Sequence, residues 1–361
     1  MLSYEGRNKR TINFLKTMYF DYPEWTPCSI GTLPATWMKY RDELESVVLA
    51  HPKVFPGYVK GSRDFDSAGS TLYEEGEYID CWGCLWKNIE RGLDSTVVKG
   101  SLEDWADFEA WAPPDAETQG HLGPLPTLDE MKQWYADAKA RGDLAGGGAG
   151  LPHGFYYMQL FYIRGFENYL MDLATDDPRI HKLKDIMIRY NCALIQRSID
   201  AGCEIMWAGE DLGMQDRLPM SPEMWRKYVK PGYEAMFGPC RDRGIPVYLH
   251  SDGHILEIIQ DLIDVGIRMV NPQIRANGLE GLQRLAKGKI ALNQDLDRQL
   301  FPFASAQQVQ DHIVEVFEGL FLKEGGLMLL AECGPDVPLE TIDTICRTFE
   351  EIGKLPDPET M

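Results

Sequence analysis

The later two thirds of the chain alternate between amphipathic helical stretches and short apolar runs. From about Leu125 onward, apolar residues recur at helical spacing in a series of segments. Short apolar runs, typical of strands, lie between these segments. The predicted strands are Glu204–Ala208, Ile245–Leu249, Arg268–Val270, Lys289–Leu292 and Leu327–Ala331. The predicted helices are Thr127–Ala140, Tyr157–Ala174, Pro178–Ala201, Pro222–Cys240, Ile255–Ile263, Gly278–Ala286, Gln307–Leu322 and Pro338–Ile352.

This alternation predicts the α/β class. Strands and helices that follow each other through short loops are typical of a parallel sheet covered by helices. About eight such units, with no G-x-G-x-x-G motif between a strand and a helix, favour a closed (β/α)8 TIM barrel over an open doubly wound sheet.

The first 120 residues are irregular and rich in aromatic side chains, so we expect an N-terminal extension with a lid. Helices are predicted over Arg7–Tyr19 and Ala35–His51, with a short strand at Trp25–Ile30. The segments Glu77–Trp86 and Ser95–Lys99 resemble a hairpin or lid. No low-complexity linker interrupts the chain, so residues 1–361 are predicted to form a single domain, of which 121–361 carry the regular units.

Composition and charge narrow the class of protein. A hydrophobic fraction of 44% and a charged fraction of 25% are typical of a soluble protein with a large core. The net charge of −20 disfavours binding to nucleic acid or to an anionic membrane surface. The N-terminus has charges where a signal peptide needs an apolar core, and no apolar run is long enough to span a membrane, so we expect a cytoplasmic protein.

The predicted strands are apolar until they end and then become sharply polar. The polar residues at these ends are Trp207, Glu210, Asp211, His250, Ser251, Asp252, Asn271, Asn293, Gln294, Asp295, Asp297, Glu332 and Cys333. Because the chemistry of a barrel lies at the carboxyl ends of its strands, acids, amides, a histidine and a cysteine there indicate a site.

A zinc site is one chemistry that these residues can provide. His250, Cys333 and a carboxylate from a third strand would form three ligands with an open fourth position. Glu210 is the preferred carboxylate, and Asp252 and Asp211 are alternatives. The competing interpretation is a hydrogen-bonded barrel histidine and a small buried cysteine.

Other features are less specific. Cys81 and Cys84 have the C-x-x-C spacing of a redox pair or half a zinc ribbon, but no second such pair exists, and packing in a lid is the preferred interpretation. The glycine-rich stretch Asp143–Gly150 lacks the Gly-Lys-Ser/Thr of a P-loop. Aromatic residues near the expected barrel mouth, among them Trp82, Tyr157 and Trp207, suit a flat apolar or aromatic ligand.

Several segments carry a resemblance to a known family. The chain resembles the uroporphyrinogen decarboxylase superfamily, whose members are (β/α)8 barrels, in Leu144–Phe155, Ala201–Gln215, His250–Gly253, Ala291–Leu300 and Glu332–Glu340. Asp80–Asn88 and Asp104–Pro114 resemble the Trp-rich N-terminal part of its methyltransferase-like members.

Within this superfamily the methyltransferase branch resembles the chain more. The decarboxylases hold substrate carboxylates with an Arg-rich first loop, and here that stretch is Cys28–Pro34, which has no arginine. Thiol-activating methyltransferases use H-x-C and a distant cysteine; His250 and Cys333 match two of these positions, whereas Asp252 replaces the intervening cysteine. One thiolate fewer leaves a harder metal, which suits the activation of an oxygen.

The resemblance therefore implies a zinc-dependent methyltransferase that moves a methyl group from a methoxylated aromatic substrate to the cobalt of a corrinoid protein. We expect Asp211 and Asp252 to be catalytic, and Glu210, His250 and Cys333 to hold zinc. The residues expected to bind substrate are Trp82, Tyr157, Trp207, Asn293 and Gln294. The chain shows no corrinoid domain of its own, so a corrinoid protein is expected as partner, and a homodimer is left open.

Two alternatives stay open at this stage. One is a metal-free decarboxylase or lyase in which Asp211, Asp252 or His250 transfers protons. The other is a non-enzymatic corrinoid or tetrapyrrole binder.

Overall fold

The structure is a computed structural model that describes residues 3–360. Its residues divide into two compact units. The first unit comprises residues 1–7, 76–87 and 96–270, and the second comprises residues 8–75, 88–95 and 271–361. The chain passes from the first unit to the second within strand β10 (Ile267–Pro272).

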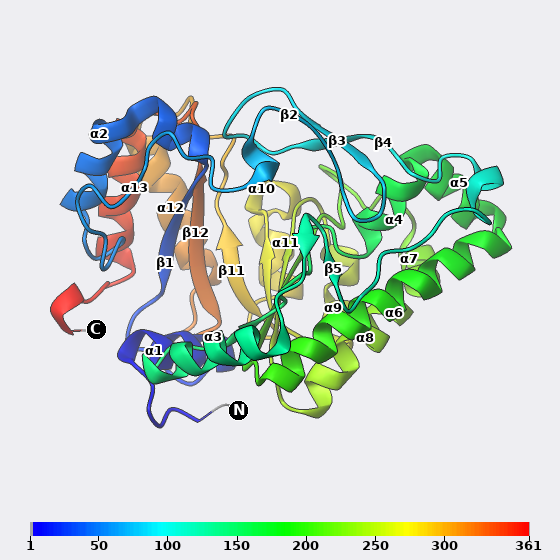
Figure 1. Cartoon of the computed structure of the whole chain (residues 1–361). Coiled ribbons are helices and arrows are strands. Elements are labelled where there is room, and N and C mark those ends of the chain that lie inside the picture. Colours follow the sequence, from blue (N-terminus) through cyan, green and yellow to red (C-terminus); the bar gives the residue numbers. More distant parts are fainter. Residues whose placement is uncertain (1–2, 361) are drawn as a thin grey trace. The chain divides into compact units, whose positions relative to one another are not determined.

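Seven strands alternate with helices in a parallel sheet of the order β1-β12-β11-β10-β9-β8-β7 (Figure 1). They are β1 (Cys28–Thr32), β7 (Gly146–Gly147), β8 (Ile205–Glu210), β9 (Val247–Ser251), β10, β11 (Ala291–Asp295) and β12 (Leu327–Cys333). This arrangement confirms the predicted α/β class and the barrel-like (β/α)8 type of fold, with seven strands in the described residues where about eight units were expected.

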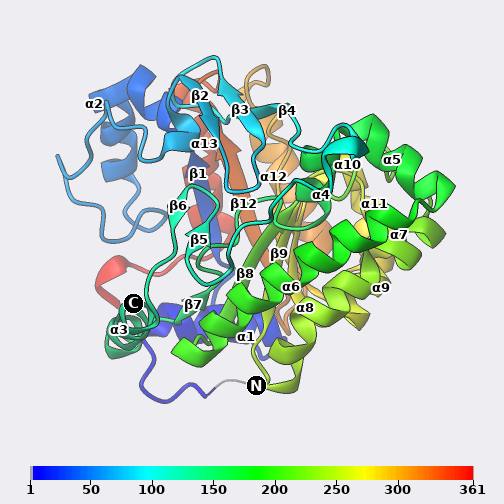
Figure 2. The same cartoon turned by 45° about the vertical axis from the view of Figure 1, so that its right-hand side comes forward.

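The first unit contains strands β7, β8 and β9 and the helices that precede and follow them in sequence. Its helices are α3 (Leu128–Ala140), α4 (Tyr157–Arg164), α5 (Phe166–Thr175), α6 (Pro178–Ala201), α7 (Pro222–Tyr228), α8 (Lys230–Asp242) and α9 (Ile259–Asp264). The long helix α6 packs on α8, and the two lie side by side in Figure 2. Phe155 contacts the rings of Tyr233 and Phe237 on α8, so the core here is aromatic.

The first unit also contains most of a small antiparallel sheet, β2 (Gly76–Ile79), β3 (Leu85–Asn88) and β4 (Thr96–Lys99). Strand β4 packs against α4. The predicted hairpin is thus part of a three-stranded sheet. A further pair of two-residue strands, β5 (Gln119–Gly120) and β6 (Gly123–Pro124), forms a tight hairpin.

The second unit contains β1, β12 and β11, which are parallel neighbours. Its helices are α1 (Lys9–Tyr19), α2 (Pro34–Ala50), α10 (Ile274–Asn277), α11 (Leu279–Leu285), α12 (Ala306–Leu320) and α13 (Leu339–Ile352). Helices α12 and α13 pack together, as do α13 and α2. Their buried residues include Ile313 and Val316 of α12 and Ile345 and Phe349 of α13.

Local sequence signals account for several helix ends. The side chain of Asp177 accepts a hydrogen bond from the backbone of Arg179 at the start of α6, where Pro178 is the first helical residue. Helix α6 ends at Gly202, whose φ of 93° favours glycine. Ser305 and Gln308 form a reciprocal capping box at the start of α12.

Two of the predicted helices are broken in the structure. Gly165, with a φ of 78°, separates α4 from α5 within the predicted Tyr157–Ala174 helix. Val229 separates α7 from α8 within the predicted Pro222–Cys240 helix. Both breaks leave the apolar spacing nearly unchanged, which is why periodicity alone did not reveal them.

No helix among residues 3–360 is both long enough and apolar enough to cross a membrane.

Candidate metal centre

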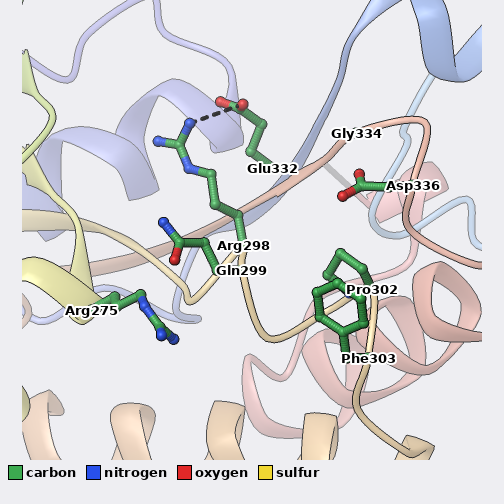
Figure 3. Close-up of a pocket in the computed structure, with 8 residues that line it drawn as sticks. All are labelled: Arg275, Arg298, Gln299, Pro302, Phe303, Glu332, Gly334 and Asp336. Carbon is green, nitrogen blue, oxygen red and sulfur yellow. Dashed lines mark hydrogen bonds and ion pairs between the residues drawn. The ribbon is translucent and has the colours of Figure 1, made fainter.

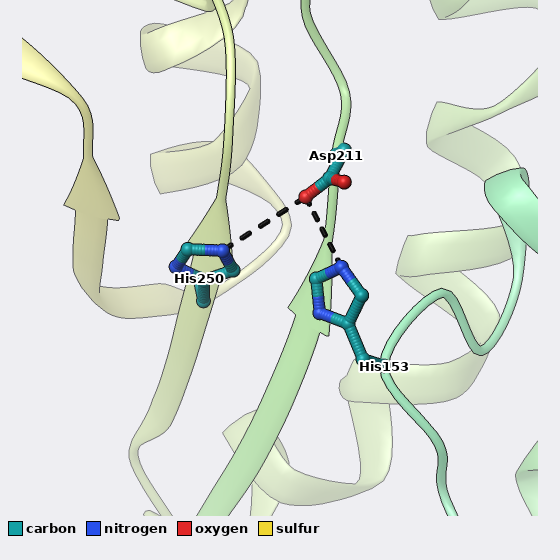
Figure 4. Close-up of side chains that lie close together, drawn as sticks. All are labelled: His153, Asp211 and His250. Atoms are coloured by element: carbon teal, nitrogen blue, oxygen red, sulfur yellow. Dashed lines mark ion pairs between the residues drawn. The ribbon is translucent and has the colours of Figure 1, made fainter. Parts of the chain in front are cut away.

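Three side chains converge at the carboxyl ends of neighbouring strands in the first unit. Asp211 follows β8, His250 lies in β9, and His153 lies in the segment after β7 (Figure 4). Asp211 Oδ1 lies 3.1 Å from His153 Nε2 and 3.8 Å from His250 Nε2. One ligand atom from each residue lies within 4.8 Å of the other two, and no other such group of three is found in residues 3–360.

Strand register explains how Asp211 and His250 meet. Strands β8 and β9 are parallel, with Gly209 paired with His250 and Glu210 paired with Ser251. The residue that follows β8 therefore lies next to the end of β9. Asp252, which follows β9, adds a second carboxylate, because its Oδ1 lies 3.2 Å from His250 Nε2.

Gly209 makes room for His153. A Cβ atom at Gly209 would lie 2.8 Å from His153 Nδ1, closer than real Cβ contacts. In addition, the backbone N–H of Gly154 donates to the carbonyl of Gly209 at 2.8 Å. The bare backbone of β8 thus holds the segment that carries the first histidine.

The loops after β8 and β9 are locked to each other by backbone contacts. The backbone N–H of His254 donates to the carbonyl of Met214 at 2.7 Å, and that of Gly213 donates to the carbonyl of Asp252 at 3.3 Å. A Cβ atom at Gly253 would clash with the backbone of Gly213. The close approach of these loops fixes the residues that carry the two carboxylates.

Glu210 points away from this cluster into the interior. Its side chain is fully buried and accepts hydrogen bonds from the backbone N–H groups of Tyr156 (2.5 Å), Tyr157 (3.0 Å) and Met158 (3.0 Å) at the start of α4. Burial raises the pKa of Glu210 to about 7, although these three hydrogen bonds and the nearby His153 oppose the rise. The structure gives Glu210 an anchoring role, and its assignment as a zinc ligand stays a prediction.

Cys333 belongs to the second unit and ends β12. It is fully buried, pairs with Thr32 of β1, and its carbonyl accepts a hydrogen bond from the hydroxyl of Thr36 at 2.9 Å. Burial raises the pKa of the Cys333 thiol far above its usual range, so the metal-free form is a neutral thiol. The His153–Asp211–His250 cluster lies in the first unit and Cys333 in the second, so the role of Cys333 as a zinc ligand stays a prediction.

Trp207 lies on the same face of the sheet as His250. It pairs with Tyr248 in the register that pairs Gly209 with His250, and alternate residues of a strand share a face. The Trp207 and Tyr248 rings are 4.7 Å apart, and Trp207 is 39% exposed despite its position in a strand that has neighbours on both sides. Gly146 leaves space for this ring, since a Cβ atom there would lie 2.7 Å from Trp207 Nε1.

The other predicted substrate-binding residues have structural contacts. Trp82 is buried and packs against Trp111 and Tyr190 in the first unit. Tyr157 is buried against Phe161 and Tyr169.

In the second unit, the fully buried Gln294 donates to the carbonyls of Pro272 (2.8 Å) and Asp295 (3.0 Å), and the Asn293 carbonyl accepts from the Asn271 side chain. For these four residues a role in substrate binding stays a prediction.

The C-x-x-C pair is part of the packed interior around Asp80. Asp80 accepts hydrogen bonds from the backbone of Trp82 and Cys84 and from the indole of Trp86. Cys84 is fully buried, and burial raises the pKa of Cys81 to about 12. These thiols are therefore poor nucleophiles, as the packing interpretation expects.

The chemistry of the cluster fits a metal ion. Two imidazoles and one carboxylate are a common ligand set for zinc and for other first-row transition metals. The side chains are partly exposed, by 49% for His153, 34% for Asp211 and 26% for His250, so the cluster is open to solvent. The histidines are also close in space, with ring centroids 5.4 Å apart.

The sequence did not single out His153. It follows a strand of only two glycines, and so short and bare a strand has no apolar run to identify it. The available signal was its place in the Leu144–Phe155 segment, which carries part of the family resemblance.

Comparisons with known proteins agree with this architecture. A family model described as uroporphyrinogen decarboxylase (URO-D) matches residues 94–352, more than half of the chain. No curated protein has a sequence that matches the chain.

Two solved structures are reported for comparison. A methyltransferase from Methanosarcina mazei is 14% identical, with a TM-score of 0.56 and coverage of 94% of this chain and 98% of that one. A putative vitamin-B12 independent methionine synthase from Listeria monocytogenes is 15% identical, with a TM-score of 0.36 and coverage of 50% and 57%. With the family model matching most of its regular α/β part, the chain belongs to the uroporphyrinogen decarboxylase (URO-D) family.

Proposed function

We propose that this protein is a zinc-dependent methyltransferase that transfers a methyl group from a methoxylated aromatic compound to the cobalt of a corrinoid on a partner protein. The observation that carries the proposal is the convergence of His153, Asp211 and His250 at the ends of β7, β8 and β9. The fold shared with a methyltransferase over 94% of the chain supports the same reaction class.

In this proposal His153, Asp211 and His250 hold the metal. A zinc ion bound there supplies a Lewis acid that polarises the ether oxygen of the substrate. Asp211 is central because its Oδ1 faces both histidine nitrogens, at 3.1 and 3.8 Å. Its negative charge also favours a bound cation over the empty site.

Asp252 has a separate role in the proposal. Its carboxylate lies beside His250, at 3.2 Å from Nε2, and next to the Asp211 loop, where its backbone N–H lies 3.4 Å from Asp211 Oδ1. In this place it orients His250 and exchanges a proton with the oxygen that leaves when the methyl group departs. The methyl carbon would lose its bond to that oxygen, which would keep the electron pair, and a reduced corrinoid on the partner protein would supply the pair that accepts the methyl group.

The Trp207–Tyr248 ring pair provides the aromatic contact for the substrate. On each strand this ring pair lies two residues before Gly209 or His250, a distance of about 7 Å along the strand. An aromatic ring that stacks on Trp207 therefore places a methoxyl substituent near the His153–Asp211–His250 cluster.

The deciding experiment is metal analysis of purified variants. We expect about one zinc per wild-type chain, and loss of most of it in His153→Ala and His250→Ala. His181→Ala is the matched control, because His181 is a similarly exposed histidine on α6 that pairs with Asp176 outside the cluster. Methyl transfer from methoxylated aromatics to a reduced corrinoid protein should be lost in the same two variants.

The variant Cys333→Ser separates the two ligand sets. If Cys333→Ser keeps its full zinc content, Cys333 is not a ligand and the ligands are those of the first-unit cluster. If the variant loses zinc, the Cys333 thiolate is a ligand. Zinc retained in both histidine variants would refute the cluster as the site. A metal-free wild-type protein would instead favour proton-transfer chemistry, and decarboxylation would then be assayed.

A further inference from the structure

A pocket lies entirely within the second unit, at the carboxyl ends of β11 and β12. It has a volume of about 540 Å³, and arginine, glutamine, carboxylate and apolar side chains line it (Figure 3). None of its residues belongs to the His153–Asp211–His250 cluster. Two arginines line it although the chain is strongly acidic, and the sequence pattern did not indicate this pair.

Arg298 is held rigidly on one wall. Its Nη2 lies 2.6 Å from Asp295 Oδ2, and its Nη1 lies 3.0 Å from Glu332 Oε1. The Asp295 side chain is only 1% exposed, so this ion pair is fixed by the end of β11. A guanidinium held by two carboxylates keeps its position without a ligand.

Arg275 is the more accessible cation. Its side chain is 53% exposed, and its Nη1 donates to Asp297 Oδ2 at 2.8 Å. A guanidinium has five N–H donors, so this single contact leaves donors for a carboxylate in the pocket. Gln299, whose side chain also lines the pocket, can add an amide donor.

Asp336 provides the opposite charge across the pocket. Figure 3 shows its carboxylate on the side away from Arg275, directed toward the space between them. Gly334 leaves room for it, because a Cβ atom there would lie 2.7 Å from Asp336 Oδ1. Glu332, which also lines the pocket, is 34% exposed and carries a second carboxylate, of which Oε1 is paired with Arg298.

The balance of charges selects the ligand class. Two guanidiniums face four carboxylates, those of Glu332 and Asp336 in the lining and those of Asp295 and Asp297 behind the arginines. This excess of negative charge disfavours a phosphate or a dicarboxylate. The accessible guanidinium of Arg275 can nevertheless bind a carboxylate, a group that a simple amine does not have.

An apolar wall completes the pocket. Phe303 is 88% exposed and lies beside Pro302 in the lining. A ligand that covers this ring gains from the removal of apolar surface from water. The three features together require a cation, a carboxylate and an apolar group in one small molecule.

We propose that this pocket binds a small zwitterion, an ammonium carboxylate with an apolar side group. Its carboxylate is held by Arg275 and Gln299, its ammonium group by Asp336 and Glu332, and its apolar group by Phe303. The pocket shares no residue with the His153–Asp211–His250 cluster, and the proposal does not depend on the proposed methyl transfer.

The test compares three probes of the same size in calorimetric titrations of the full-length protein. L-Phenylalanine has both charges, 3-phenylpropionate has only the carboxylate, and 2-phenylethylamine has only the ammonium group. We expect L-phenylalanine to bind about tenfold more tightly than either of the others, because each charged end makes its own charge-assisted hydrogen bonds. Equal binding of either singly charged probe, or no binding of L-phenylalanine, would overturn the proposal.

Two substitutions assign the ends of the ligand. Asp336→Asn should bring L-phenylalanine down to the affinity of 3-phenylpropionate, and Arg275→Gln should bring it down to that of 2-phenylethylamine. The controls are Asp311→Asn and Arg347→Gln, which make the same changes on exposed faces of α12 and α13 outside the pocket. Affinity lost equally in the control variants would assign binding to another place and reject the pocket.

Discussion

The carboxylate of Glu210 joins the end of β8 to the start of α4. Its position beside Asp211, at the end of an apolar strand, predicts that it is a zinc ligand. The strand pleat, however, directs the side chains of these two neighbouring residues to opposite sides. Asp211 faces the histidines, whereas Glu210 satisfies three buried backbone donors of residues 156–158. These donors lie at the start of α4, shortly after His153, so Glu210 helps to hold that histidine in place.

Replacement of Glu210 by alanine should therefore destabilise the fold. The variant Glu210→Ala leaves three buried N–H groups without their acceptor, and we expect the free energy of unfolding to fall by about 3 kcal/mol or more. Urea denaturation followed by circular dichroism measures the change.

The control for this prediction is Glu234→Ala, at an exposed position of α8. It should change the free energy of unfolding by less than about 0.5 kcal/mol. If Glu210→Ala were as stable as Glu234→Ala, the hydrogen bonds to residues 156–158 would not have the anchoring role given to them here.

At the scale of elements, glycines allow the backbone approaches that bring His153, Asp211 and His250 together. The two-residue strand β7 pairs with β8 through Gly146 and Gly147, and Gly146 lies against the Trp207 ring. Beyond the strands, Gly213 and Gly253 let the loops after β8 and β9 touch. None of these positions has space for a side chain.

The loop contact predicts a specific effect of one added methyl group. Gly253→Ala adds a Cβ atom that clashes with the backbone of Gly213, at a residue with a φ of 80°. We expect a loss of about 2–3 kcal/mol in the free energy of unfolding, together with weaker zinc binding, because the loops that carry Asp211 and Asp252 must separate. Thermal denaturation and zinc titration measure the two effects.

Gly244→Ala separates the clash from the cost of the backbone conformation. Gly244 has a φ of 69° and no atom within 4 Å of the position of a Cβ, so it carries only the conformational cost, about 1 kcal/mol. Zinc affinity should be unchanged in this variant. A similar loss of zinc affinity in both variants would show that loop contact does not position the site.

At the scale of the whole molecule, the net charge of −20 is the dominant electrostatic feature. Carboxylates in excess repel each other in the folded state more than in the expanded unfolded chain. Several are paired locally, such as Glu204 with Arg7 and Asp172 with Arg164, but twenty negative charges stay uncompensated.

The metal-free protein should therefore become more stable as salt is added. Raising NaCl from about 10 mM to about 300 mM shortens the Debye length from about 30 Å to roughly 6 Å, and we expect Tm to rise by about 2 °C or more. Differential scanning calorimetry at constant pH measures the shift. A falling Tm would mean that attractive ion pairs outweigh the long-range repulsion.

Much of the fold could be predicted from the sequence because it depends on local signals. Apolar spacing located α6, α12 and α13, and Pro222, the first residue of a predicted helix, is the first residue of α7. The apolar runs before Asp211 and His250 located β8 and β9 and placed both residues at strand ends. The breaks at Gly165 and Val229 and the strand β7 were not predicted, because none of them changes or creates a hydrophobic period.

The sequence by itself thus determined the alternation of strands and helices, the URO-D family, and the positions of Asp211 and His250 at strand ends. Each of these depends on a short stretch of the chain. Only the tertiary structure decided that His153 completes the cluster, that Glu210 turns to backbone donors, and that Arg275 and Asp336 face one pocket. These pairings depend on strand register and on loops that come together from distant parts of the chain. Strand register and loop geometry decide which residues a side chain contacts, and neither can be read from residue type and spacing alone.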